Sequence, residues 1–188
     1  MTIRQATGQD AQAVAELVLL AIKDIGYQLT GGRTEAEVLE QLKLFYVEEG
    51  NRFSQELYLV KESGQDIAGM ILCYHGKDAD RLYQPIAEHL VQVRGIADVR
   101  IDQEADEDEY YIDALAVRPE YQRRGYGRGL LEAAEQYAVV RSFRKIALNV
   151  DQDNEQALRL YQQIGYKADK VIRINGKPYW HMYKLLNL

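Results

Sequence analysis

The chain has 188 residues, of which 47% are hydrophobic and 28% charged, and its formal net charge is −6. This length and composition are typical of one well-buried α/β domain, so we expect a single domain over residues 1–188. The acidic balance argues against nucleic acid as the main partner.

No apolar run reaches the ~18 residues that would cross a bilayer, and the N-terminus lacks the pattern of a secretory signal peptide. We therefore expect a cytoplasmic protein with no membrane partner. Cys73 is the single cysteine, which excludes an internal disulfide, and its apolar neighbours predict a buried thiol.

The N-terminal part of the chain predicts one strand followed by two helices. A short alternating stretch at residues 2–6 is expected to form a strand near a sheet edge. Capping-box spacing and helical periodicity then predict a helix that begins at Thr7 and ends near Gly26. After a loop over residues 27–33, a second helix is expected over residues 34–50.

Two strand-like runs over residues 57–61 and 67–74 flank a polar turn, which predicts an antiparallel hairpin. The pattern then degrades over residues 77–109, which we interpret as an insertion between the third and fourth strands. This insertion ends in residues 102–109, which contain six carboxylates and no basic residue. Such a run is either a solvated face or mobile loop, or a means of attracting a cationic substrate, and both can hold together.

Residues 110–140 carry the strongest pattern in the chain. A nearly continuous apolar strand, interrupted by Asp113 and ended by Pro119, precedes a loop rich in glycine and arginine and then a helix. Glycines let backbone N–H groups approach a phosphate, and a helix N-terminus adds about half a positive charge. The loop is therefore expected to bind an anion such as a pyrophosphate.

The C-terminal part predicts a strand over residues 145–150, a helix that stops at Gly165, and strands over residues 170–174 and 179–185. The last two strands flank an Asn-Gly dipeptide, which favours a type I′ hairpin turn.

This order of elements, with the loop Gln122-x-x-Gly125-x-Gly127, resembles the GNAT superfamily of acetyl-CoA-dependent N-acetyltransferases. A second motif, Asn154-Glu-Gln-Ala157-Leu-Arg-Leu-Tyr161-Gln-Gln-Ile-Gly165-Tyr166, is similar to that family's pattern on the helix after strand five. The resemblance implies an α/β (α+β) fold: a mixed, mostly antiparallel sheet of about seven strands, splayed between strands four and five, with helices on both faces. The loop lacks the Walker ending and a true Gly-x-Gly-x-x-Gly, which argues against other nucleotide sites.

The resemblance also implies that acetyl-CoA is the co-substrate. In relatives, backbone groups at the positions of Leu115 and Val117 pair with the pantetheine arm, and amides at the positions of Arg123 to Arg128 hold the pyrophosphate. The arginine side chains could contact phosphate or be solvated charges. The implied cofactor-binding residues are Leu115, Ala116, Val117, Gln122, Arg123, Arg124, Gly125, Tyr126, Gly127, Arg128, Gly129, Asn154 and Tyr161.

Direct acetyl transfer from a thioester to an amine needs an uncharged amine, a polarised carbonyl and a proton for the departing thiolate. A backbone N–H near Val117 could stabilise the oxyanion. Tyr161 matches the residue that protonates the thiolate in many relatives, and a phenol with its ordinary pKa of about 10 is a proton donor at physiological pH. The alternative for Tyr161 is an aromatic ring packed in the core.

Asp113 and Glu109 are the candidate general bases, because they lie on or just before the strand that faces the amine in relatives. A carboxylate in an apolar strand needs a partner, so Asp113 could instead be structural, and Glu109 could simply attract a cationic amine as part of the acidic run. His75 is a further candidate base, whereas His89 and His181 are expected to be structural or exposed. The histidines are widely separated, so no metal site is expected.

We therefore expect an N-acetyltransferase that moves acetyl from acetyl-CoA to a primary amine of a small molecule or peptide, cationic amines included. Its acceptor side should be formed by residues 27–33, 77–109 and 175–180. The alternatives are a non-catalytic acyl-CoA-binding regulatory module and a protein-binding module that uses the acidic run. Exposed strand edges and the aromatic pair Tyr179-Trp180 favour a homodimer.

Overall fold

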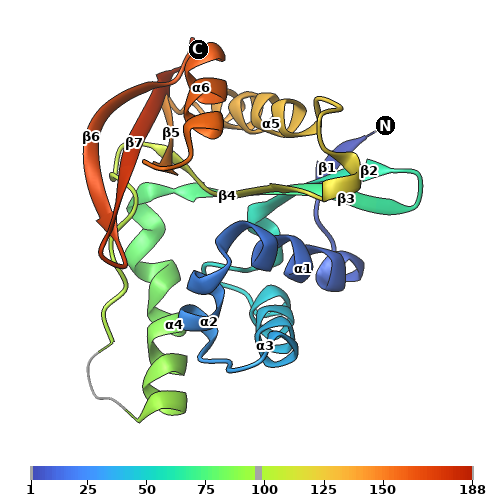
Figure 1. Cartoon of the computed structure of the whole chain (residues 1–188), viewed down its shortest axis with the longest axis vertical. Coiled ribbons are helices and arrows are strands. Elements are labelled where there is room, and N and C mark those ends of the chain that lie inside the picture. The colour runs from blue at the N-terminus through green and yellow to red at the C-terminus, as the bar shows by residue number, and fades with distance from the viewer. Residues whose placement is uncertain (1, 96–98, 188) are drawn as a thin grey trace.

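A sheet of seven strands separates two layers of helices in the computed structural model, which describes residues 2–95 and 99–187 (Figure 1). The strand order is β1-β2-β3-β4-β5-β7-β6, and only β4 and β5 run parallel. The expected mixed, mostly antiparallel sheet is confirmed. The strands are β1 (Ile3–Gln5), β2 (Tyr58–Ser63), β3 (Asp66–His75), β4 (Tyr110–Val117), β5 (Lys145–Asp151), β6 (Lys167–Ile174) and β7 (Lys177–Leu185).

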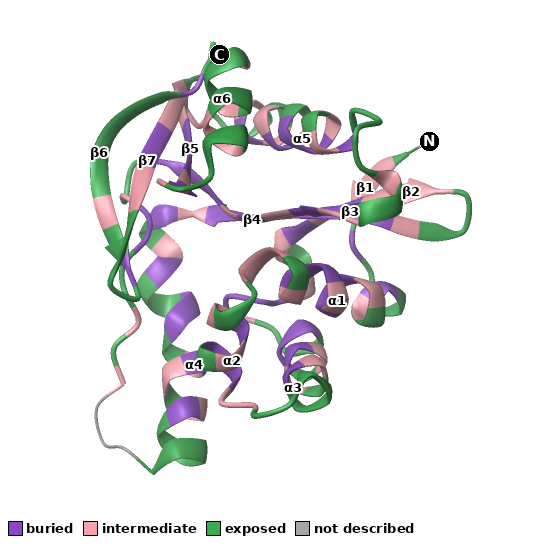
Figure 2. Ribbon diagram, in the orientation of Figure 1, coloured by how far each residue is buried: buried purple, intermediate pink, exposed green. Residues whose placement is uncertain are grey.

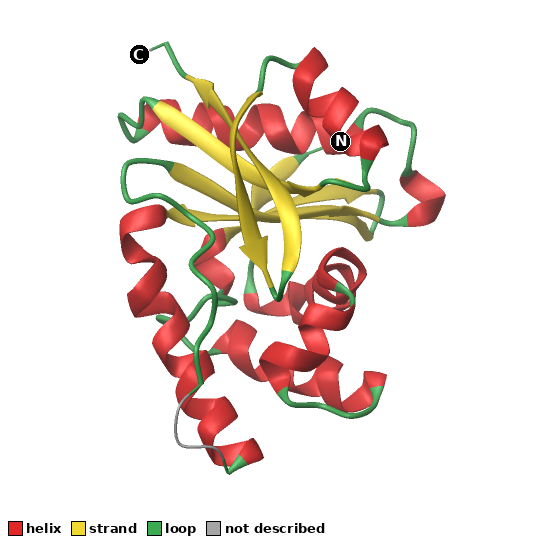
Figure 3. Cartoon of the chain, turned by 60° about the vertical axis from the view of Figure 1, so that its left-hand side comes forward, coloured by secondary structure: helices red, strands yellow, loops and turns green. Residues whose placement is uncertain are grey.

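The helices cover both faces of the sheet, as Figures 1 and 3 show. Four of the described helices lie on one face and two on the other. The first group is α1 (Ala11–Ile22), α2 (Asp24–Thr30), α3 (Glu35–Val47) and α4 (Ala79–Arg94); the second is α5 (Tyr126–Val140) and α6 (Glu155–Gln163).

The two apolar cores follow from the alternation of side chains along the central strands. In β3, Met70 and Leu72 pack toward α1 and α3, whereas Ile71 and Cys73 pack toward α5. A strand buried on both faces needs apolar residues at every position, which explains the continuous apolar run. Cys73 is buried, as predicted, and Figure 2 shows the same concentration of buried residues on β3 and β4.

The parallel pairing of β4 and β5 is short. It comprises three residue pairs and ends at Ile112 and Leu148. Beyond that point β4 stays paired with β3 as far as Val117, and β5 stays paired with β7 as far as Asp151. The two strands therefore separate in the middle of the sheet, which confirms the expected splay.

The first helix differs from its predicted form. It breaks at Lys23, which has φ 47° and ψ −119°, and a second helix then runs through Gly26 to Thr30. The left-handed residue that ends this segment is Gly31, at φ 73°. The predicted end at Gly26 was wrong because the apolar residues beyond it continue to pack on the core, and much of the predicted loop is helical.

The remaining boundaries lie close to their predicted positions. The Thr34 side chain accepts a hydrogen bond from the Glu37 amide and begins α3, and Asn154 caps α6 in the same way. Asn175 and Gly176 both have positive φ, as a type I′ turn requires. Part of the predicted insertion forms α4. None of the described helices is both long and apolar enough to span a membrane.

Candidate active site

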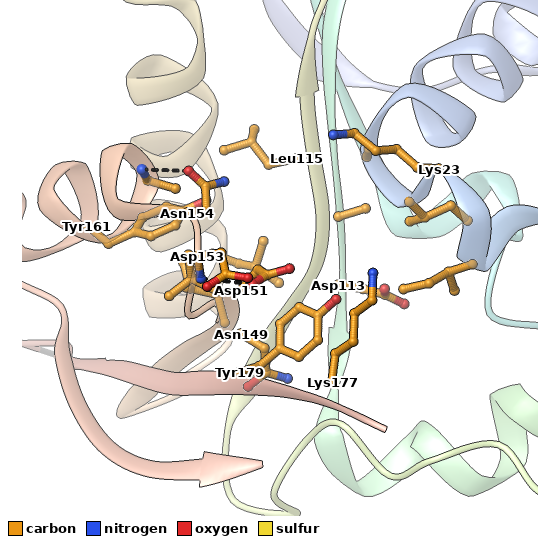
Figure 4. A pocket seen from close by; sticks show the side chains of 18 of the residues that line it. Lys23, Asp113, Leu115, Asn149, Asp151, Asp153, Asn154, Tyr161, Lys177 and Tyr179 are labelled. Carbon is orange, nitrogen blue, oxygen red and sulfur yellow. Dashed lines mark hydrogen bonds between the residues drawn. The ribbon is translucent and has the colours of Figure 1, made fainter. Parts of the chain in front are cut away.

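A cavity of about 650 Å³ opens where β4 and β5 separate (Figure 4). Its walls come from the α1–α2 junction, the middle of β4, the end of β5, the start of α6 and the start of β7. Because the split is set by backbone pairing, the cavity is a consequence of sheet topology and needs no special residue to open it.

The cavity gathers only part of the predicted cofactor set. Leu115, Asn154 and Tyr161 line it. Ala116 and Val117 lie farther along β4, beside the glycine-rich loop, where the Gln122 side-chain amide donates to the Val117 carbonyl oxygen at 3.1 Å. The predicted residues thus follow one path from the cavity along β4 to the loop.

The loop itself presents the start of a helix. Arg123 and Gly125 adopt left-handed backbone angles, φ 61° and 77°, and α5 begins immediately afterwards. Its first backbone hydrogen bond runs from the Gly129 amide to the Gly125 carbonyl oxygen at 3.0 Å. The amides that precede Gly129 point out along the helix axis, which is the usual arrangement of a phosphate-binding helix N-terminus.

The side chains of the loop are mostly occupied in local contacts. All three of its arginines are exposed; Arg128 pairs with Glu132 at 2.9 Å, and the Arg124 guanidinium lies 5.4 Å from the ring centroid of Tyr121. The Tyr126 ring stacks on Tyr121, with centroids 6.1 Å apart. Any anion at this loop would therefore meet the backbone first, while phosphate contact by an arginine stays a prediction.

Tyr161 is packed in the core and is also accessible from the cavity. Its ring packs against Tyr166, with centroids 5.9 Å apart, while the residue also lines the cavity. Burial raises the pKa of Tyr161 to about 12. The phenol is consequently protonated at neutral pH and has a proton to donate.

Asp113 has the partner that a carboxylate in an apolar strand requires. Arg52 Nε and Nη2 donate to Asp113 Oδ2 and Oδ1, both at 2.7 Å, and Nη2 also donates to Glu104 Oε1 at 2.9 Å. The side chains of Arg52 and Asp113 are 3% and 1% exposed. Since both Asp113 oxygens are held by a buried guanidinium, this geometry favours the structural role over that of a general base.

The ion pairs continue into a hydrogen-bonded network that crosses the split. Tyr111 Oη donates to Glu104 Oε2 at 3.1 Å, and Asn149 Nδ2 donates to Tyr111 Oη and to the Glu104 carbonyl oxygen, both at 2.8 Å. Burial raises the pKa of Glu104 above its ordinary value. The sequence interpretation missed Arg52, Glu104 and Asn149, although a lone carboxylate in a buried strand did signal an absent basic partner.

The solvated-face interpretation of the acidic run was wrong for two of its members. Glu104 is 8% exposed and Glu109 is fully buried, whereas Glu107 and Asp108 are exposed. Glu109 Oε2 lies 3.3 Å from the Lys145 amine. Its partners come from strands distant in sequence, and Glu109 is not among the residues that line the cavity.

His181 is a buried structural residue, which agrees with one of its two predicted outcomes. Its Nδ1 lies 2.6 Å from Asp169 Oδ1, and its Nε2 lies 3.2 Å from Glu109 Oε2. A carboxylate therefore faces each ring nitrogen, and this arrangement favours the imidazolium form, in which both nitrogens donate. Burial alone lowers the pKa of His181, but the bonds to Glu109 and Asp169 outweigh it and raise the pKa.

One group of side chains has the spacing of a possible metal site. It contains Asp106, Glu109 and His181, and one ligand atom from each lies within 4.8 Å of the others. The group could not be found from the sequence, because His181 lies 72 positions after Glu109. The Lys145 and Lys170 amines already pair with the same carboxylates, Lys170 at 2.6 Å from Asp106. The carboxylate charge is thus balanced by protein cations rather than left for a metal ion.

The other histidines lie outside the main cavity. His75 packs against Phe143, with ring centroids 4.8 Å apart, and His89 Nε2 lies 2.8 Å from the Thr30 carbonyl oxygen. His89 is thus structural, and His75 is not among the residues that line the cavity at the split.

The three segments expected to form the acceptor side do meet. A smaller cavity of about 120 Å³ is lined by Gln28 of α2, Arg94 of α4 and Asn175 of the last hairpin, together with Arg52. Ile25 borders both cavities. The Arg52–Asp113 ion pair lies between them, because Asp113 lines the larger cavity and Arg52 the smaller one.

Comparison with known proteins identifies relatives in sequence and in fold. The sequence model of the Acetyltransferase (GNAT) family matches residues 29–166. A crystal structure of an acetyltransferase is 30% identical, covers 100% of both chains and gives a TM-score of 0.83. An N-acetyltransferase from Staphylococcus aureus Mu50 is 25% identical, covers 97% of this chain and 100% of its own, and gives a TM-score of 0.76.

A peptidyl-lysine N-acetyltransferase from Escherichia coli K12 is 35% identical over 80 residues. That alignment covers 42% of this chain and 48% of the relative, so the chain matches about half the length of that protein.

The substitution Arg52→Met is expected to lower the free energy of unfolding by about 3–5 kcal/mol, because it leaves Asp113 and Glu104 buried without their cation. Urea denaturation at neutral pH measures the change. The double variant Arg52→Met/Asp113→Asn should be more stable than the single variant. Arg159→Met, which removes an exposed helix pair, is the control and should change stability by less than about 0.5 kcal/mol; an equally small effect of Arg52→Met would contradict the assignment.

The His181 contacts predict a pH dependence of stability. The folded-state pKa of His181 lies above the ordinary histidine value of about 6.5. The stabilisation is therefore complete when the pH is below the ordinary value, and it is lost as the pH rises through the folded-state pKa. The Tm of His181→Asn should therefore fall furthest below that of the wild type at the acidic end of the histidine range. His89→Asn serves as the control; a Tm difference for His181→Asn that stays constant with pH would refute the charged-imidazole assignment.

Proposed function

The chain belongs to the GNAT acetyltransferase family, and from that premise we propose that it transfers an acetyl group from acetyl-CoA directly to a primary amine of a small molecule or peptide. The observation that carries this proposal is the cavity at the β4–β5 split, which brings Tyr161 and the exposed edge of β4 at Leu115 to one space.

The described residues fit acetyl-CoA along one continuous path. The edge of β4 after Ile112 has no partner strand on its β5 side, so its backbone can pair with the amide groups of a pantetheine arm. Farther along, the amides at the start of α5 can hold a pyrophosphate. When bound, acetyl-CoA supplies the acetyl thioester at the cavity.

Three groups of the chain would then act on the reaction. A backbone N–H near Val117 stabilises the developing oxyanion, a type of contact that contributes about 3 kcal/mol in acyl-transfer sites. Tyr161 gives its proton to the departing sulfur as the C–S bond breaks. The Arg52–Asp113 pair keeps the opposite wall rigid and uncharged overall.

The proton of the attacking amine is proposed to leave through solvent in the cavity. Asp113 is a weak candidate for the base because Arg52 holds both of its oxygens, and Glu109 is a weak candidate because it pairs with Lys145 and His181 away from the cavity. The acceptor is proposed to be a lysine-like primary amine, in keeping with the similarity to the peptidyl-lysine N-acetyltransferase of Escherichia coli.

Calorimetric titration with acetyl-CoA, followed by an assay of free-thiol release across a panel of amines, tests this function. We expect saturable heat with acetyl-CoA and thiol release that depends on the amine. Absence of heat with both acetyl-CoA and CoA would refute the proposal. Heat without thiol release for any amine would favour the non-catalytic acyl-CoA-binding module.

Tyr161→Phe removes the proposed proton donor and leaves the ring in place. We expect kcat for thiol release to fall by about 10²–10⁴-fold, the usual contribution of a positioned acid, with the affinity for acetyl-CoA unchanged. Tyr137→Phe, outside the cavity, is the matched control. Undiminished turnover in Tyr161→Phe would eliminate its acid role.

A further inference from the structure

The cavity at the β4–β5 split contains two lysine side chains of the protein itself. Lys23 and Lys177 both line it, together with Leu115 and Tyr161. Both residues are exposed, and neither side-chain amine forms an ion pair or hydrogen bond with another described residue. The acceptor space of a proposed lysine acetyltransferase therefore already holds primary amines.

The two lysines enter the cavity from different sides. Figure 4 shows Lys23 at the α1–α2 junction directed toward Leu115, where the pantetheine arm is proposed to pair. Lys177 begins β7 and is directed toward Asp113, at the end of the cavity away from that path. Tyr179, two residues later, also lines the cavity, as expected for alternate residues of one strand. Lys177 thus places a primary amine inside the cavity, on the side of Asp113.

We propose that Lys177 is a self-acetylation site, an inference that rests on the proposed acetyltransferase function. A bond forms between Lys177 Nζ and the acetyl carbon, and the C–S bond of the thioester breaks. The sulfur takes the proton of Tyr161, and the amine releases its own proton to water. The products are Nζ-acetylated Lys177 and free CoA thiol.

Two features of the site favour this reaction. Lys177 is held in the reaction cavity by the chain, so its amine meets the acetyl group without the entropy cost of a bimolecular encounter. The Lys177 amine is also in no ion pair with another described residue, since Arg52 already pairs with the nearby Asp113, so no salt bridge holds it away from a thioester.

Acetylation of Lys177 would also change the site. It removes one positive charge and lengthens a side chain that already occupies the acceptor end of the cavity. External amines would then have less room to approach the thioester. Modified protein is therefore expected to acetylate amines several-fold more slowly than unmodified protein.

The test uses the full chain incubated with acetyl-CoA, with intact mass and peptide mapping as readouts. We expect one acetyl group, on Lys177, gained with a first-order rate constant that does not depend on protein concentration. Added CoA should slow the reaction by competing for the site. Lys177→Arg should abolish the modification, whereas Lys77→Arg, an exposed lysine outside the cavity, should retain it.

Several results would overturn the inference: acetyl on Lys23 or scattered over surface lysines, a rate constant proportional to protein concentration, or insensitivity to added CoA. Thiol release with external amines while Lys177 stays unmodified would refute self-acetylation alone and leave the acetyltransferase function standing. Absence of heat with acetyl-CoA and CoA would refute the function itself.

Discussion

The buried guanidinium of Arg52 is the constraint around which the rest of this site is arranged. A charge removed from water is costly unless it is paired and hydrogen-bonded, and Arg52 pairs through Nε and Nη2 with Asp113 of β4 and Glu104 of the acidic run, while Nη1 is buried without a hydrogen-bond partner among the described residues. Through Tyr111 and Asn149 the same network reaches β5. The segment after α3, the insertion and both strands of the split are thereby held together at one point.

The cavity exists because the backbone pairing between β4 and β5 stops, and it does not depend on a sequence motif. Parallel pairing stops after Ile112, so the outer edge of β4 keeps backbone groups that a ligand can use. The glycine-rich loop also offers backbone groups to a ligand. Its left-handed residues Arg123 and Gly125 turn the chain into the start of α5, where the first amides point out along the helix axis. Both halves of the proposed cofactor site are therefore made of backbone, which explains why the arginine side chains can remain in solvent.

Buried charge pairs add to the strand pairing that holds the C-terminal hairpin beside the cavity. Glu109 and Asp169 hold the His181 imidazolium from two sides, and Lys145 shares Glu109. These contacts fix β7 close to the start of β4. Lys177 and Tyr179 lie only a few residues from His181 on the same strand, so this ion group and the pairing of β7 with β5 together hold the proposed acceptor wall.

The sequence alone determined most of the elements and the family resemblance, because apolar periodicity, the glycine loop and the Asn154–Tyr161 helix are local patterns; the cofactor path follows from that resemblance and remains a proposal. It could also show that Asp113 needed a partner, but it could not identify Arg52, which lies 61 positions away. The same limit concealed that two members of the acidic run are buried, since the cations that pair with Glu104 and Glu109 come from other strands and loops. Only the tertiary structure decided which charges are paired and which lysines face the cavity, because pairing depends on distances between segments that no local pattern encodes.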